Sequence, residues 1–90
     1  MKTLEELHEA KRIADALSSL LAHPGWAILS SYLRNLRAAA LEELIATEDL
    51  DRIVRLQERV RVIDALFDEI SALRDQGAVA EKLLRGEIDA

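Results

Sequence analysis

The sequence has no cysteine, one proline, three glycines and three aromatic residues among its ninety positions. Without cysteine the chain has no disulfide bond, no thiolate nucleophile and none of the cysteine-based structural zinc sites. With Trp26, Tyr32 and Phe67 as the whole aromatic complement, the core must be built from leucine, isoleucine, valine and alanine. Half of the residues are hydrophobic, and this aliphatic composition favours helices packed on helices, so the predicted fold class is all-α.

Basic residues are outnumbered, since 12 lysines and arginines against 17 aspartates and glutamates give a formal net charge of −5. This balance argues against the sequence-independent attraction to phosphate that drives most nucleic-acid binding. The N-terminal MKTLEEL is acidic and amphipathic, unlike a signal peptide, and no stretch approaches the roughly 18 apolar residues of a membrane span. We therefore expect a cytoplasmic protein that does not enter the membrane.

Apolar residues that recur at spacings of three and four predict three helices. Thr3 and Glu6 have the spacing of a capping box, so the first helix should span about 4–22. A second helix over about 24–46 and a third over about 48–75 should form an antiparallel hairpin, because the turn between them is short. The N-terminal helix should then pack on this hairpin.

The segment His23-Pro24-Gly25-Trp26 separates the first two predicted helices. Proline disfavours the α conformation in the residue before it and is well tolerated in a first helical turn. We interpret these four residues as a structural corner, in which Trp26 anchors the end of the core.

The start of the third helix is predicted at Thr47, which is followed by Glu48, Asp49 and Asp51. A capping hydroxyl and three carboxylates would lie beside the positive end of the helix dipole, where both are stabilising.

The end of the third helix is predicted at Gln76 and Gly77, because glycine readily adopts the left-handed conformation after a last turn. A short C-terminal helix over 78–84 and a flexible tail over about 86–90 would complete a single domain of residues 1–90.

Large apolar residues are more numerous than one hairpin seam requires. The seam of the third helix follows steps of three and four through Ile53, Leu56, Val60, Ile63, Phe67 and Ile70. Exposed apolar patches usually mark interfaces, so we predict a homo-oligomer interface formed by Ile28, Tyr32, Val54, Val62, Leu66 and Leu73. The alternative is a closed monomeric bundle in which the first and last helices cover these side chains.

Arginine is concentrated in the hairpin, where Arg52, Arg55 and Arg59 follow one another at steps of three and four. Arginine forms bidentate pairs with carboxylates and phosphates. The functional interpretation is a contact surface for an acidic protein or for DNA. The structural interpretation is pairing with carboxylates within or between subunits, from the set Glu42, Glu43, Glu48, Asp51 and Glu58.

Catalytic patterns are missing from the sequence. There is no Ser/His/Asp set, no glycine-rich phosphate loop and no pair of carboxylates at a catalytic spacing. His8 and His23 do not have the spacing of metal ligands. We predict a protein that is not an enzyme, with no cofactor and no metal.

Residues 20–70 resemble small helical-hairpin proteins that are encoded in tailed-phage and prophage genomes near head and packaging genes. The resemblance lies in Pro24 and Trp26 at a helix start, in the acidic turn of residues 48–51, and in Arg55-Leu56-Gln57 with Val60. It implies a location in the host cytoplasm or on the virion. The predicted function is a non-enzymatic helical protein that self-associates as a component of phage assembly or DNA packaging.

Two alternative functions are consistent with the residues. The first is a small acidic inhibitor or regulator that binds a host protein through its carboxylates. The second is a small helical enzyme, because the residue pattern of positions 3–21 is similar to that of the first helix in the helical class of chorismate mutase. Of the basic residues that the mutase resemblance would require along this helix, only Lys11 and Arg12 are present.

Overall fold

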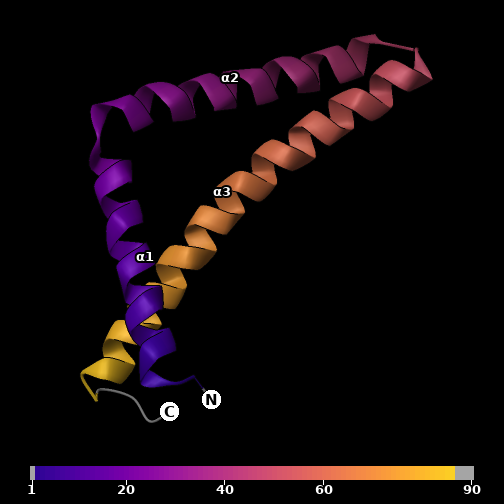
Figure 1. The fold of residues 1–90 in the computed structure, drawn as a ribbon. Coiled ribbons are helices and arrows are strands. Elements are labelled where there is room, and N and C mark those ends of the chain that lie inside the picture. The colour runs from indigo at the N-terminus through magenta and orange to yellow at the C-terminus, as the bar shows by residue number, and fades with distance from the viewer. Residues whose placement is uncertain (1, 87–90) are drawn as a thin grey trace. The chain divides into compact units, whose positions relative to one another are not determined.

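The computed structural model describes residues 2–86, and over this range the predicted all-α fold is confirmed (Figure 1). Three helices are present among the described residues: α1 spans Leu4–Ala22, α2 spans Pro24–Ala46 and α3 spans Leu50–Leu84. The bounds of α1 and α2 are those expected from the sequence.

The corner between α1 and α2 forms at the predicted residues. The Thr3 hydroxyl accepts a hydrogen bond of 3.1 Å from the Glu6 N–H and caps the start of α1. At the other end His23 is extended, with φ −74° and ψ 137°, and its N–H donates to the Leu20 carbonyl. This is the conformation that a following proline favours, and α2 begins directly at Pro24.

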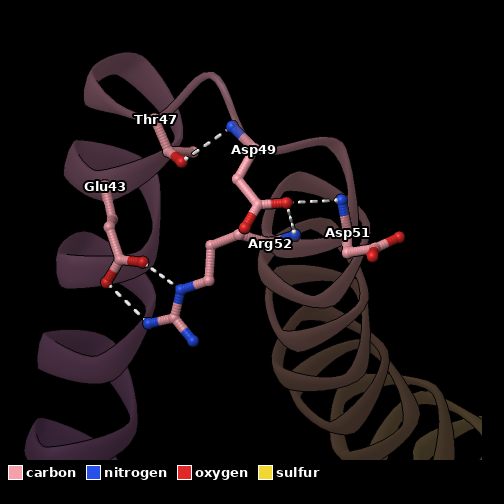
Figure 2. A network of polar contacts seen from close by, with 5 residues as sticks. All are labelled: Glu43, Thr47, Asp49, Asp51 and Arg52. Atoms are coloured by element: carbon pink, nitrogen blue, oxygen red, sulfur yellow. Dashed lines mark hydrogen bonds and ion pairs between the residues drawn. The ribbon is translucent and has the colours of Figure 1, made fainter.

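The start of α3 differs from the prediction, which placed the cap at Thr47. Asp49 is the N-cap instead, because its Oδ1 accepts from the backbone N–H groups of Asp51 (3.0 Å) and Arg52 (3.4 Å) (Figure 2). The Thr47 hydroxyl accepts from the Asp49 N–H at 3.2 Å. Thr47 therefore stabilises the turn, and Asp49 caps the helix. As a result α3 begins two residues later than expected.

The end of α3 also differs, and the separate C-terminal helix predicted over 78–84 is wrong. The helix continues through Gly77 to Leu84. The left-handed glycine is Gly86, with φ 73°, and its N–H donates to the Leu83 carbonyl at 3.1 Å. A single glycine within a helix costs only about 1 kcal/mol relative to alanine, so a tertiary contact can decide whether a helix continues through it. Residues 87–90 of the predicted tail lie outside the described residues.

The helices gather into two compact units, which share α3. The hairpin unit is Pro24–Asp68 and contains α2 with the first part of α3. The terminal unit contains α1 with the part of α3 from Glu69 onward. In the terminal unit α1 packs on the C-terminal part of α3, which is longer than expected from the sequence.

In the terminal unit most of the buried residues are small. Leu7, Ala14, Gly77 and Ala80 are buried. A Cβ atom added at Gly77 would overlap the Ala14 Cβ and lie 3.1 Å from the Ala10 carbonyl oxygen. Glycine is thus required at this position because the backbones of α1 and α3 approach closely, not because a helix ends there.

In the hairpin unit the buried residues are large aliphatic side chains on α3 and small ones, Ser30 and Ala40, on α2. Leu56 and Ile63 are buried, and Ile53, Val60 and Phe67 are half-buried, as the predicted seam requires. The seam on α2 contains Ser30, which is 4% exposed, whereas the neighbouring Leu29 is 49% exposed. The Ser30 hydroxyl donates to the Ala27 carbonyl at 3.3 Å, so its burial leaves no unpaired polar group.

Candidate interaction surface

The guanidinium of Arg52 is already engaged within the hairpin unit. It forms a bidentate pair with the Glu43 carboxylate on α2, through Nη2 and Oε1 at 2.8 Å and through Nε and Oε2 (Figure 2). This hydrogen bonding lowers the pKa of Glu43, and the nearby positive charge of Arg59 contributes to the same effect. For Arg52 the structural interpretation, pairing with a carboxylate of the same chain, is the one that the geometry supports.

Three other arginines of the hairpin unit also have partners in the same chain. Arg37 binds Asp64 through Nε at 2.6 Å and Nη2 at 3.2 Å, which joins α2 to α3 and lowers the pKa of Asp64. The remaining two contacts are an Arg61–Glu58 pair at 3.0 Å and the Arg34 guanidinium 5.3 Å above the Phe67 ring.

The Phe67 ring also packs edge-on against Trp26, with ring centroids 6.1 Å apart. Trp26 is half-buried. Both aromatic contacts are of the kind that stabilises a core beyond the area it buries. Trp26 at the start of α2 is thus in contact with Phe67 of α3.

Arg55 and Arg59 differ from these four arginines. Within residues 2–86, no hydrogen bond or ion pair joins either guanidinium to another side chain. The two residues lie one turn apart on the same face of α3, with both side chains exposed. They are the members of the predicted basic stripe that remain available to a partner.

These two arginines border a shallow groove between α2 and α3. The groove has a volume of about 430 Å³ and is lined by Leu36 of α2 and by Arg55, Glu58, Arg59, Val62 and Ile63 of α3. Its floor is apolar, and Val62 is 59% exposed there. Leu66 lies one turn beyond Val62 on the same face and is also exposed. We call this surface the Arg-edged groove.

The six predicted interface residues do not form one stripe. Val62 and Leu66 belong to the Arg-edged groove, whereas Val54, though 63% exposed, is displaced by about 80° around α3 from Val62 at 3.6 residues per turn. Ile28 and Tyr32 are exposed on α2, on the side of that helix opposite its buried seam. Leu73 is half-buried and belongs to the terminal unit.

The tip of the hairpin is a second exposed surface. Ile45 in the last turn of α2 is 89% exposed and Leu50 in the first turn of α3 is 76% exposed. The carboxylates of Glu42 and Glu48 have no hydrogen-bond or ion-pair partner in the part of the chain that the structure describes. The Asp51 carboxylate points away from the Arg52 cluster (Figure 2). We call this surface the acidic tip.

The terminal unit contains hollows with a different character. One of them is polar and is lined by residues of both charge signs, among them Lys11, which is bound to Asp15 at 2.9 Å. Among residues 2–86, no group of three or more histidine, cysteine or acidic side chains is arranged to hold a metal ion. In the same range no helix is both long enough and apolar enough to span a bilayer.

Comparisons with protein families, with curated proteins and with solved structures found no match to this chain. The site is accordingly defined by its own geometry: an apolar groove with two unpaired arginines, on a hairpin whose tip is acidic and apolar.

Proposed function

We propose that this chain is a non-enzymatic helical interaction protein that self-associates through its hairpin unit. The observation that carries the proposal is the Arg-edged groove, where the exposed Val62 and Leu66 lie beside the unpaired Arg55 and Arg59. A groove of this kind fits a macromolecular surface, because its floor is apolar and its edge offers two donors that can form bidentate bonds.

The apolar content of the hairpin unit supports association. Burial of one leucine or valine side chain stabilises by roughly 1.5–3 kcal/mol relative to exposure. A hairpin of two helices has a small core, and in this one Leu56 is the large side chain that is almost completely buried. Contacts between copies would add to this core, and repetition of a weak contact in an assembly makes the whole assembly stable.

The phage setting of the proposal comes from the resemblance in residues 20–70. A small helical protein that binds copies of itself suits a component of phage assembly or DNA packaging, in which many identical subunits build one structure. In that setting the exposed arginines would contact an acidic surface of a neighbouring protein. DNA is the less favoured ligand because the net charge of the chain is −5.

The proposal is tested by sedimentation equilibrium of the wild-type chain and two matched variants. We expect the wild type to exceed its monomer mass of 10.1 kDa increasingly with concentration. Val62→Glu should return it to the monomer, because a carboxylate would then lie on the apolar floor. Ile28→Glu introduces the same carboxylate at an exposed position of α2, on the side opposite its buried seam, and it should leave association unchanged. A wild type that stays at the monomer mass throughout contradicts the proposal.

The acidic tip favours a second candidate function, a small regulator that binds a basic surface of another protein. Its carboxylates are unpaired within the described chain and lie around the exposed Ile45 and Leu50. Complementary charge of this kind speeds association and selects partners. The second candidate requires a strict monomer, so the same sedimentation experiment separates it from the first.

A further inference from the structure

We infer that the self-association is heterologous: the acidic tip of one copy docks in the Arg-edged groove of the next. The inference rests on the proposed function and specifies which two surfaces meet. Both surfaces belong to the hairpin unit, and within one copy no hydrogen bond or ion pair joins Glu42 or Glu48 of the tip to Arg55 or Arg59 of the groove. The charged groups of both surfaces are therefore available to a second copy.

The charge of the groove disfavours contact of the groove with itself. If the groove of one copy met the groove of another, two copies each of Arg55 and Arg59 would come together. The acidic residue of the lining, Glu58, already pairs with Arg61 at 3.0 Å. Such an interface would bring together four guanidinium groups without a free carboxylate to balance them, and like charges in an interface oppose association.

The acidic tip supplies the complementary chemistry. It combines two highly exposed aliphatic side chains, Ile45 and Leu50, with the unpaired carboxylates of Glu42 and Glu48. The aliphatic side chains match the floor formed by Val62 and Ile63, and the carboxylates match the guanidinium groups at its edge. Arg52 and Glu43, which also lie near the tip, form a bidentate ion pair with each other, and this pair adds no net charge to the tip.

A heterologous contact has a structural consequence. Each copy would carry one tip and one groove, so copies add head to tail and form either a closed ring or an open filament. A ring of two subunits would be a dimer, and every other product would contain more than two subunits.

Charge exchange between the two surfaces tests this inference in the full-length chain. The groove variant is Arg55→Glu/Arg59→Glu, the tip variant is Glu42→Lys/Glu48→Lys, and the third protein carries all four changes and keeps the net charge of the wild type. A control variant, Glu69→Lys/Asp75→Lys, makes the same change in net charge as the tip variant but lies in the terminal unit. Helicity is checked by far-ultraviolet circular dichroism, and association is measured by sedimentation.

The groove variant and the tip variant should each associate on the order of tenfold to a hundredfold more weakly than the wild type. The fourfold variant should regain association, because its basic tip fits its acidic groove, and the control should behave as the wild type. A tip variant that associates like the wild type overturns the heterologous contact and leaves self-association standing. The same conclusion follows if all variants are helical and the fourfold variant stays dissociated. A wild type that never associates overturns the proposed function itself.

Discussion

The two units of this small protein hold their helices together by different means. In the terminal unit Ala14 and Gly77 bring the backbones of α1 and α3 so close that no Cβ atom fits between them. In the hairpin unit the buried residues are Leu56 and Ile63 of α3 with Ser30 and Ala40 of α2, and bidentate arginine–carboxylate pairs also join the two helices.

This difference determines where polar links can form. The ion pairs resolved between described residues of the terminal unit connect side chains of one helix, as in Lys11–Asp15 and Arg12–Glu9. Large seam residues separate α2 from α3 and leave flanks that an arginine can bridge, as Arg37 and Arg52 do. The same flanks leave a groove where arginines are unpaired. The hairpin unit is thus suited to binding, since its packing produces both the apolar floor and the charged edge.

The largest expected effect comes from removing volume in the hairpin unit. Leu56→Ala deletes the large side chain that is 1% exposed and should destabilise the fold by about 2–5 kcal/mol. Val54→Ala removes a similar group from a position that is 63% exposed and should change stability by less than about 0.5 kcal/mol. Urea unfolding followed by Trp26 fluorescence measures both, because the tryptophan lies in this unit. Equal effects would mean that the hairpin has no specific seam.

The next effect comes from adding volume in the terminal unit. Gly77→Ala improves helix propensity by about 1 kcal/mol, yet it places a methyl group where the Ala14 Cβ lies. We expect a net loss of about 1–3 kcal/mol from overpacking. Ala14→Gly in the same chain removes the overlapping atom and should restore much of that stability, leaving the Ala10 carbonyl 3.1 Å from the new methyl group. Urea unfolding followed by circular dichroism measures both variants.

Two results of these experiments would contradict the close-approach interpretation. One is a Gly77→Ala chain that is more stable than the wild type, as expected of an ordinary exposed helical glycine. The other is an Ala14→Gly change that destabilises the Gly77→Ala chain as much as it does the wild type, because rescue requires the two positions to be coupled.

The ends of α1 and α2 could be predicted because they depend on local chemistry. A threonine hydroxyl three residues before a glutamate N–H, and a proline that sets the conformation of the residue before it, act without help from distant parts of the chain. The seam of α3 could also be predicted, since the spacing of its apolar residues determines which side chains share a face.

The structural role of Gly77 could not be predicted from local sequence. Gly77 and Gly86 are both near the end of the third helix, and only one is the helix cap, with φ 73°. What distinguishes them is the presence of Ala14 against Gly77, a contact between residues 63 positions apart. Sequence spacing within α3 carries no information about that contact. The sequence also could not decide between Thr47 and Asp49 as the N-cap of α3. Both residue types cap helices, and they lie only two positions apart.

The candidate site was predicted in part. The sequence placed Arg52, Arg55 and Arg59 on one stripe, and the exposure of Val62 and Leu66 agrees with their predicted place in an interface. It could not separate the paired Arg52 from the two unpaired arginines, because pairing depends on how α2 and α3 align. That alignment places Glu43 opposite Arg52 and leaves Arg55 without a carboxylate partner in the range that the structure describes.

The smallest expected effect is a decrease in stability at acidic pH, which should arise mainly in the hairpin unit. Hydrogen bonds from Arg52 and Arg37 lower the pKa values of Glu43 and Asp64. A carboxyl whose pKa is lower in the folded state stabilises the fold above the ordinary carboxyl pKa of about 4. This contribution is lost as the pH falls through the lowered value, so the melting temperature reported by Trp26 fluorescence should decrease on acidification from about pH 5 toward pH 3.

Substitution of the two cross-helix arginines should remove this dependence and so locate it in the hairpin unit. Arg37→Gln/Arg52→Gln leaves Glu43 and Asp64 with more ordinary pKa values, so its melting temperature should be lower than that of the wild type near neutral pH and should decrease less on acidification. Arg12→Gln is the matched control, since Arg12 lowers the pKa of Glu9 along α1 without joining two helices. It should leave the transition reported by Trp26 almost unchanged. If the double variant kept the full dependence on acid, the cross-helix pairs would contribute nothing to the hairpin, and its stability would rest on the apolar seam alone.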